Sequence, residues 1–173
     1  MYFRINSYSR TAAVNYALKY ALKPNPDYRY FPVVADTSGD CTNFTSQCLY
    51  AGGAPMIYNS NYPWWYKHNS YNKNLDTWSV SWTVAHSFYW FLKVNNQNNS
   101  AGAKGLEVNN VNLLELGDLI FYENDNGMIF HSAIVTGTSS EGPLISQHSF
   151  EAANISYLKS WKSRHMHFLK IRV

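Results

Sequence analysis

The 173-residue sequence has few charged residues, two cysteines and no long apolar run. Charged residues make up 14% of the chain, and the net charge of +3 provides no basic stripe for nucleic acid. No stretch approaches the roughly 20 apolar residues of a membrane-spanning helix. We therefore expect neither a nucleic-acid partner nor a membrane span, whereas the mild positive charge is compatible with an anionic polymer.

The two cysteines, Cys41 and Cys48, are expected to remain free thiols. Seven residues apart on one helix, their Cα atoms would be separated by about 10.5 Å. A disulfide needs a separation below roughly 7 Å. Cys48 is followed by Leu49 and Tyr50 and is therefore predicted to be a core residue.

Hydrophobic residues make up 46% of the chain and aromatic residues 17%, which indicates a packed globular protein. The length suits one domain over residues 1–173. Periodic apolar positions predict three helices, over residues 8–23, 41–51 and 81–94. The third has its apolar set at Val84, Phe88, Phe91 and Leu92.

From residue 106 the sequence changes to short β-rich runs separated by turn-forming residues. These runs cover residues 116–123, 129–137, 143–150 and 167–173. Helices followed by strands indicate the α+β class, with N-terminal helices packed on a C-terminal antiparallel sheet. Between them, residues 54–80 are predicted to form a long aromatic loop.

Cys41 lies where a reactive thiol would be expected. Asp40 is a favoured N-cap residue, so Cys41 would be the first residue of its helix. Unpaired backbone N–H groups and the helix dipole stabilise an anion there, and both lower a thiol pKa. The alternative is that Cys41 is a small buried core residue, which is a common position for free cysteine.

A nucleophilic cysteine needs a base, and two of the six histidines lie on a predicted hairpin. If its arms pair symmetrically about residues 137–142, His131 faces His148 on one side of the sheet. One imidazole would then take the thiol proton and the other would hold its ring. A slip of one residue would separate them. His165 and His167 share a strand face but have no neighbouring ligands, so we expect surface histidines and no metal.

Several motifs together resemble a known group of enzymes. DCTNF at 40–44, LELGDLIFY at 114–122, HSAIV at 131–135 and ISQHS at 145–149 occur in that order. The order resembles that of the papain-like cell-wall hydrolases, the NlpC-type cysteine peptidases and CHAP amidases. The match is strongest to the bacterial family of the "putative amidase domain". It includes RTAAVNYALKYA at 10–21 and DCTNFTSQCLYAGGAPM at 40–56.

The resemblance implies a papain-like fold in which Cys41 is the nucleophile, His131 the general base and acid, and His148 the orienting residue. In NlpC-type enzymes the residues flanking the cysteine help to hold the free amine of the substrate. Asp40 and Thr42 occupy those positions here. This chain departs from the pattern at Asn43 and Ala133, where those enzymes have glycine, so substrate contacts are expected to differ.

The aromatic segment is a candidate substrate surface. Trp64, Trp65 and Tyr66 could stack on sugars or hold a stem peptide at the rim of a cleft. Alternatively, these rings pin a long connection to the core.

The sequence therefore predicts a cysteine hydrolase that needs no cofactor and cleaves an amide bond in peptidoglycan, within the stem peptide or between glycan and peptide. Two alternatives stay open: the same machinery in a protein-directed toxin, deamidase or acyl transferase, and a non-catalytic wall-binding module.

We expect a monomer that acts outside the cell or at the wall. No signal peptide is evident, so the protein is expected to be delivered by a phage, exported by another route, or a domain of something larger.

Overall fold

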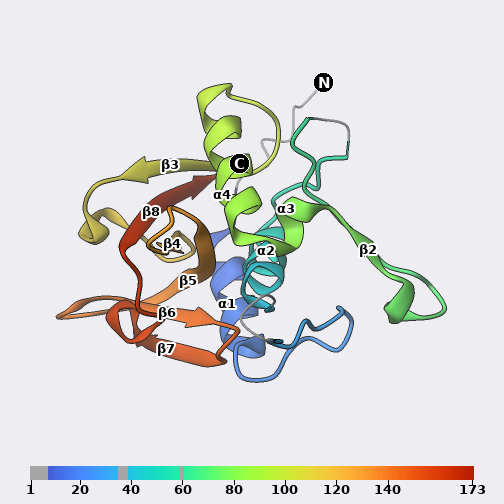
Figure 1. Cartoon of the computed structure of the whole chain (residues 1–173), viewed down its shortest axis with the longest axis horizontal. Coiled ribbons are helices and arrows are strands. Elements are labelled where there is room, and N and C mark those ends of the chain that lie inside the picture. The colour runs from blue at the N-terminus through green and yellow to red at the C-terminus, as the bar shows by residue number, and fades with distance from the viewer. Residues whose placement is uncertain (1–7, 35–38, 59–60) are drawn as a thin grey trace.

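A computed structural model describes residues 8–34, 39–58 and 61–173. Figure 1 shows helices from the first half of the chain beside a sheet from the second half, so the predicted α+β class is confirmed. The helices are α1 (Arg10–Tyr20), α2 (Cys41–Ala51), α3 (Val80–Thr83) and α4 (Ala85–Gln97), with 3-10 turns η1 (Lys73–Leu75), η2 (Val111–Leu113) and η3 (Tyr157–Lys159). The strands are β1 (Tyr66–Lys67), β2 (Thr77–Trp78), β3 (Lys104–Val108), β4 (Leu119–Glu123), β5 (Ile129–Ser139), β6 (Gly142–Gln147), β7 (Ala152–Ser156) and β8 (His165–Arg172).

The main sheet has six antiparallel strands in the order β3-β8-β4-β5-β6-β7. Strands β4 to β7 follow one another as neighbours, as expected of hairpin connections. β8 departs from this pattern because it inserts between β3 and β4. The sequence predicted β4, β5, β6 and β8 but missed β3 and β7, whose short runs mix polar and apolar residues.

The first two helices form as their sequences predict. In α1 the Ser9 side chain accepts a hydrogen bond from the Ala12 amide, and Ala13, Val14 and Ala17 are buried. In α2 the bounds agree with the prediction, and Gly52 is its C-cap. Most residues of α2 are buried, because α1, α4 and the sheet all pack around this helix (Figure 1).

The predicted third helix is two helices. Val84 has extended backbone angles, φ −109° and ψ 118°, and separates α3 from α4. The side chain of Val84 is 44% exposed, so the prediction that Val84 belongs to the buried apolar set of this helix is wrong. Phe88, Phe91 and Leu92 are fully buried, as predicted.

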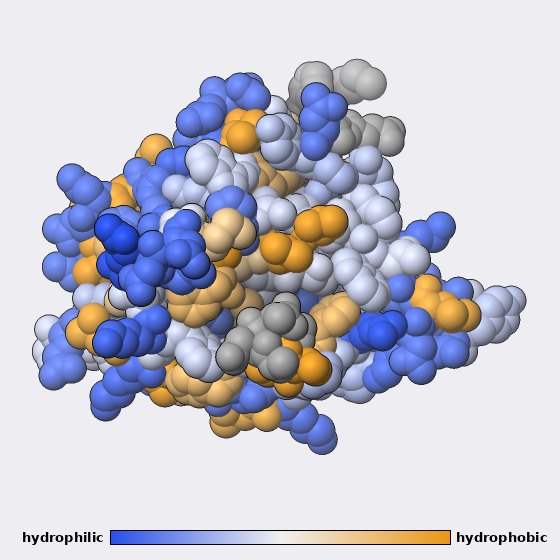
Figure 2. Space-filling model, viewed as in Figure 1, coloured by the Kyte–Doolittle hydropathy of each residue, from blue (hydrophilic) through white to orange (hydrophobic). Residues whose placement is uncertain are grey.

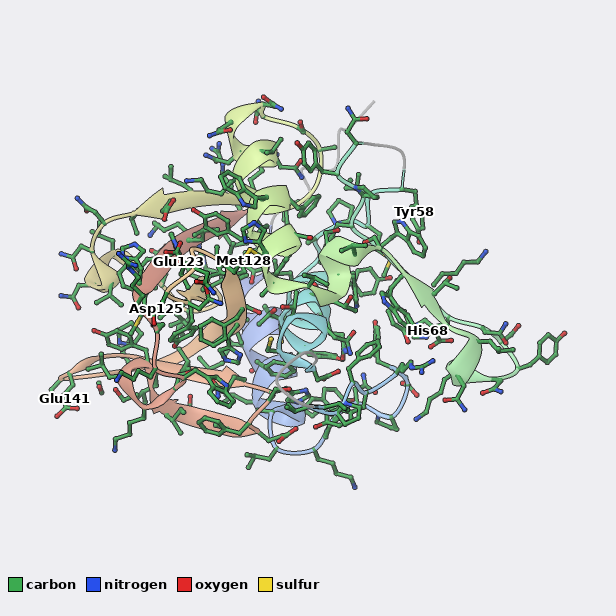
Figure 3. The ribbon with its side chains drawn as sticks, in the orientation of Figure 1. Tyr58, His68, Glu123, Asp125, Met128 and Glu141 are labelled. Atoms are coloured by element: carbon green, nitrogen blue, oxygen red, sulfur yellow. The ribbon has the colours of Figure 1, made fainter. Side chains whose placement is uncertain are left out.

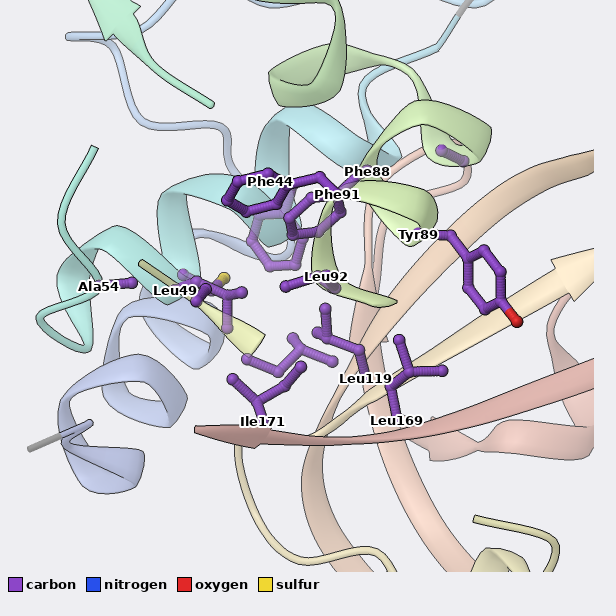
Figure 4. Close-up of a cluster of buried hydrophobic side chains, with 14 of the residues drawn as sticks. Phe44, Leu49, Ala54, Phe88, Tyr89, Phe91, Leu92, Leu119, Leu169 and Ile171 are labelled. Atoms are coloured by element: carbon purple, nitrogen blue, oxygen red, sulfur yellow. The ribbon is translucent and has the colours of Figure 1, made fainter. Parts of the chain in front are cut away.

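The sheet has an apolar cluster on each face, because alternate residues of a strand point to opposite sides. Leu119 and Phe121 of β4 belong to the larger cluster, which packs against α2 and α4 (Figure 4). Ile120 and Tyr122 belong to the smaller cluster on the opposite face. The sheet is therefore covered on both faces near β4 and β5.

The Gly-Asp pair before β4 joins distant parts of the chain. Asp118 is fully buried, and its Oδ1 accepts hydrogen bonds from Arg10 of α1 at 2.6 Å and from the Ile171 amide of β8 at 2.8 Å. Its Oδ2 accepts from the Glu115 amide at 2.8 Å. A buried carboxylate is stable when it is paired in this way, so Asp118 holds α1 and β8 against β4.

The aromatic segment 54–80 has more structure than the predicted loop. β1 and β2 pair in a narrow antiparallel ribbon that projects from the body of the molecule beside α3 (Figure 1). Tyr71 at its turn is 95% exposed. Among the described residues, no helix is long and apolar enough to cross a membrane.

Candidate active site

The thiol of Cys41 lies at the start of α2, as the sequence predicts. Asp40 is the N-cap residue, and its carbonyl accepts the first helical hydrogen bond from the Phe44 amide at 2.9 Å. Cys41 is 7% exposed and lines a cleft of about 510 Å³. The backbone N–H groups of the first helical turn therefore surround the sulfur with positive potential.

β5 brings His131 to this thiol. His131 lines the same cleft as Cys41, and its side chain is almost fully buried. Its Nε2 lies 3.0 Å from Oε1 of Gln147. An amide oxygen only accepts, so Nε2 carries a hydrogen, which leaves Nδ1 as the nitrogen available to the thiol.

The surroundings of Cys41 change its pKa in two directions. Burial acts to raise the pKa of the thiol, because the interior disfavours a charge. The positive charge of His131 and its hydrogen bond lower the pKa, and further hydrogen bonds from Thr42 and the Ser132 backbone do the same. The net effect lowers the pKa of Cys41 from 9.0 to about 7. A large fraction of the thiol is then a thiolate near neutral pH.

Cys48 differs from Cys41 in its surroundings and in the direction of its pKa shift. It is fully buried in the large apolar cluster, and burial raises the pKa of its thiol. Both cysteines are free, which confirms the expectation from their spacing. The prediction that Cys48 is a core residue is confirmed as well.

The residue that holds His131 is Gln147, which the sequence analysis missed. Gln147 is fully buried, and its Oε1 also accepts a hydrogen bond from Ser160 at 2.6 Å. Its Nε2 donates to the Phe150 carbonyl at 3.1 Å. With all three bonds made, the amide has a fixed orientation and presents an acceptor to the imidazole.

The register of the β5–β6 hairpin explains why the prediction for His148 was wrong. The turn is tighter than assumed, because Ser139 pairs with Gly142. A bulge between Val135 and Gly137 then shifts the register, so that Ile134 faces Ser146. The net slip is one residue, which puts Gln147 on the face of His131 and turns the following residue to the other face.

His148 lies on the helix side of the sheet and does not orient His131. Its ring stacks on Phe44 at 4.2 Å, its Nδ1 lies 2.5 Å from Oδ2 of Asp40, and its Nε2 lies 2.9 Å from the Tyr20 carbonyl oxygen. A carbonyl only accepts, so Nε2 carries a hydrogen. The contact between Nδ1 of His148 and the Asp40 carboxyl group also needs a proton, so a buried hydrogen bond joins these two side chains.

The two residues that flank Cys41 are buried and bonded within the protein. The Asp40 carboxylate accepts from the Phe31 amide at 3.0 Å and from the Asn43 side chain at 2.8 Å, besides His148. The Thr42 hydroxyl lies 3.2 Å from that of Ser132. Asp40 is 1% exposed and Thr42 fully buried, so the structure gives neither a free face toward a substrate.

The three aromatic candidates lie in different places. Trp64 is fully buried, stacks with Phe91 at 5.7 Å and donates from Nε1 to Ser46. Tyr66 is 2% exposed and donates to Asp76 at 2.5 Å. These two rings pin the segment to the core, which was the alternative interpretation. Trp65 is partly exposed and lines a second cavity.

The cleft around Cys41 is mainly apolar with a few polar groups. Its walls include Val84, Ile129, Phe130 and Trp161, and Lys162 provides a positive charge. Among the described residues that line it, none is acidic. The apolar walls suit a ligand with apolar groups, and Lys162 suits a ligand with a carboxylate.

The described residues contain no group of three or more His, Cys, Asp or Glu side chains that could hold a metal. His167 is not the surface residue that the sequence led us to expect. Its Nδ1 lies 2.6 Å from Glu107 and its Nε2 lies 3.0 Å from Glu123. This network bridges β3, β8 and β4, and none of its three residues lines the cleft of Cys41.

Comparison with known proteins gives a family and two bacterial relatives. A family model described as "Putative amidase domain" matches residues 7–170. The uncharacterized protein YhbB of Bacillus subtilis (strain 168) is 38% identical over 153 residues, covering 86% of this chain and 44% of its own length. The uncharacterized protein YjcM of the same strain is 31% identical over 160 residues, covering 87% of this chain and 33% of its own length.

The chain thus spans less than half the length of these two relatives. No solved structure matches it. The description of the family model indicates a hydrolase of the amidase type.

Proposed function

The chain belongs to the family of the "putative amidase domain", and from this premise we propose a cysteine-dependent hydrolase that cleaves an amide bond in bacterial peptidoglycan. The observation that carries the proposal is the pairing of Cys41 with His131 in an open cleft, with the pKa of the thiol lowered to about 7. Pairs of this kind generate the nucleophile of cysteine hydrolases.

The geometry supports a two-step reaction. The Cys41 thiolate attacks the substrate carbonyl, and the backbone N–H of Cys41 donates to the oxyanion that forms. The His131 imidazolium gives its proton to the leaving amine as the C–N bond breaks, which leaves an acyl-enzyme. His131 then takes a proton from water, the hydroxide attacks the thioester, and a free carboxylate is released with regeneration of the thiol.

Gln147 is the positioning residue in this proposal. Its Oε1 accepts from Nε2 of His131 and so fixes the tautomer in which Nδ1 faces the sulfur. The arrangement of a cysteine at a helix N-terminus against an antiparallel sheet that supplies histidine and glutamine supports a papain-like architecture. His148 has no part in the reaction; it secures Asp40 at the start of α2.

The lining of the cleft favours one part of the expected substrate over another. The resemblance implied that Asp40 would hold a free amine, but the carboxylate is buried and its oxygens are occupied. Lys162 instead offers a positive charge, which suits the carboxylates of peptidoglycan stem peptides. We therefore propose that Lys162 faces a carboxylate of the bound peptide.

Digestion of purified peptidoglycan followed by mass analysis of the new termini tests the proposal. Wild-type protein should release free amines and carboxylates in equal number, and Cys41→Ala should release none while keeping its circular dichroism spectrum. Cys48→Ala is the matched control and should remain active wherever it stays folded. Undigested wall with the wild type would refute the substrate, and turnover by Cys41→Ala would refute the cysteine mechanism.

A further inference from the structure

A second cavity of about 580 Å³ lies between the β1–β2 ribbon and helices α3 and α4. We call this cavity the aromatic groove. Its walls include Tyr62, Trp65, Trp78, Val80, His86 and Trp90. The cleft of Cys41 is lined by the intervening residues 83–85 of the same α3–α4 segment. The two cavities therefore flank one short stretch of chain. We propose that the aromatic groove binds an uncharged saccharide.

The lining of the groove matches the chemistry of a sugar ring. Three tryptophans from separate segments provide flat apolar faces, and Trp90 is 45% exposed. None of the described lining residues is Lys, Arg, Asp or Glu. Three serines, Asn61 and Pro63 complete the lining. A pyranose presents C–H groups on its faces and hydroxyls at its edge, so it meets both kinds of surface without a charge.

His86 leaves a hydrogen-bond donor that needs an acceptor in the groove. Its Nδ1 accepts from the Ile129 amide at 3.3 Å, and its Nε2 lies 3.1 Å from Nε1 of Trp90. A neutral imidazole accepts at one nitrogen, so the two donors cannot both be satisfied. Ile129 is buried in β5, whereas Trp90 is open to solvent, so the imidazole serves the amide. Nε2–H of His86 and Nε1–H of Trp90 are then both available to a ligand oxygen.

The rings of the groove are held in place before any ligand binds. The Trp65 amide donates to the Ser79 hydroxyl at 3.0 Å, and its ring stacks on Tyr58 at 5.7 Å. Trp78 packs edge-on against Phe31 at 4.9 Å, and the Arg29 guanidinium lies 5.6 Å over its ring. Rings fixed in this way lose little entropy when a ligand binds.

Figures 2 and 3 show the region where the β1–β2 ribbon meets the body of the molecule. Figure 3 shows Tyr58 near the junction of the β1–β2 ribbon with the body, and His68 further out along the ribbon. In Figure 2 the surface over α3 is mostly pale with two apolar patches, whereas the surface over β3 and β8 is mainly hydrophilic with scattered apolar patches. The face with the groove is thus of intermediate polarity, as expected of exposed tryptophan and tyrosine.

The inference goes beyond the proposed hydrolysis, because binding to the groove needs no turnover. The test uses Cys41→Ala protein titrated with a neutral tetrasaccharide of β-linked N-acetylglucosamine, followed by tryptophan fluorescence and calorimetry. Saturable binding is expected. Adding Trp90→Ala should weaken it about tenfold, because one stacking face and one donor are lost. Trp90→Phe keeps the ring without the N–H and should give a smaller loss.

Tyr71→Ala is the control, because Tyr71 is 95% exposed at the end of the ribbon and should bind like the parent. Loss of binding in Trp161→Ala but not in Trp90→Ala would place the sugar in the cleft of Cys41 and overturn the inference. Binding of a neutral phenylalanine tripeptide instead of the sugar would also overturn it. Wall digestion without sugar binding would leave the proposed hydrolase intact and refute the groove alone.

Discussion

Replacing His131 with glutamine tests whether the imidazole activates the thiol of Cys41. With its pKa at about 7, the wild-type thiol is about half ionised at neutral pH. Without His131 the lowering effects of its charge and hydrogen bond disappear, while burial continues to raise the pKa. The pKa should return to 9.0 or above, so that about 1% or less is ionised at pH 7.

The reaction rate at one pH understates this change. The ionised fraction falls about fiftyfold, but a thiolate of higher pKa is intrinsically about tenfold more nucleophilic. The net loss of alkylation rate at pH 7 is therefore only about fivefold. The assay is accordingly a pH profile of iodoacetamide alkylation from pH 5 to pH 10, with Cys41→Ala as the blank.

The profile of the wild type should have its midpoint near pH 7, and His131→Gln should move the midpoint upward by about two pH units. Cys48 should contribute nothing to the signal, since it is fully buried and the pKa of its thiol is raised. An unchanged midpoint in His131→Gln, or a wild-type midpoint at 9.0 or above, would refute the argument for an activated thiol.

Three further predictions concern the polar contacts. Gln147→Ala should raise the midpoint of the same alkylation profile and lower kcat about tenfold to a hundredfold, because His131 loses its acceptor; Gln147→Glu keeps an acceptor and should restore most of the activity. His148→Ala leaves the buried Asp40 carboxyl group without one of its hydrogen-bond partners, so urea denaturation should show a loss of about 2–3 kcal/mol, and a loss below about 1 kcal/mol would contradict the pairing. Burial acts to raise the pKa of Glu107, but hydrogen bonds from neighbouring side chains lower this pKa from 4.5 to about 2. The ionised carboxylate therefore stabilises the fold above pH 4.5, and this contribution disappears as the pH falls through 2. Glu107→Gln should therefore be less stable than the wild type by about 1–2 kcal/mol at pH 7, after allowance for partial exposure, and the two should become equally stable only below pH 2. A difference that does not vary with pH would exclude the linkage.

The sequence predicts what depends on local patterns. The start of α2 agrees with Asp40 as the N-cap residue, although the Asp40 side chain makes no capping hydrogen bond, and the end of α2 follows from Gly52. The strand that contains His131 follows from its β-branched neighbours. These features need only a few adjacent residues, so they are correct in the structure.

The identity of the residue beside His131 could not be predicted in the same way. The register depends on a two-residue turn after Ser139 and on a bulge near Val135, and each of these shifts the pairing. A shift of one residue exchanges Gln147 for His148. Gln147 and His148 are neighbours in the sequence, so either could be the residue that contacts His131. Only the alternative register, in which Gln147 shares a face with His131, indicates the correct one.

Long-range pairing also lies outside the reach of local patterns. The insertion of β8 between β3 and β4 follows from shape and burial over the whole sheet. Similarly, Trp64, Trp65 and Tyr66 look alike in the sequence, but in this short extended segment Trp64 and Tyr66 are buried in the core and Trp65 is partly exposed. Burial of each ring depends on what the ribbon packs against.

The position of β8 has a consequence for how the chain folds during synthesis. β3 cannot join the sheet until residues 165–172 have left the ribosome, because β8 lies between it and β4. The residues of α2 leave the ribosome far earlier, because His131 follows Cys41 by ninety residues in the sequence. During that interval the nascent chain presents an ordinary, weakly acidic cysteine, and chemical competence comes only with late closure of the fold.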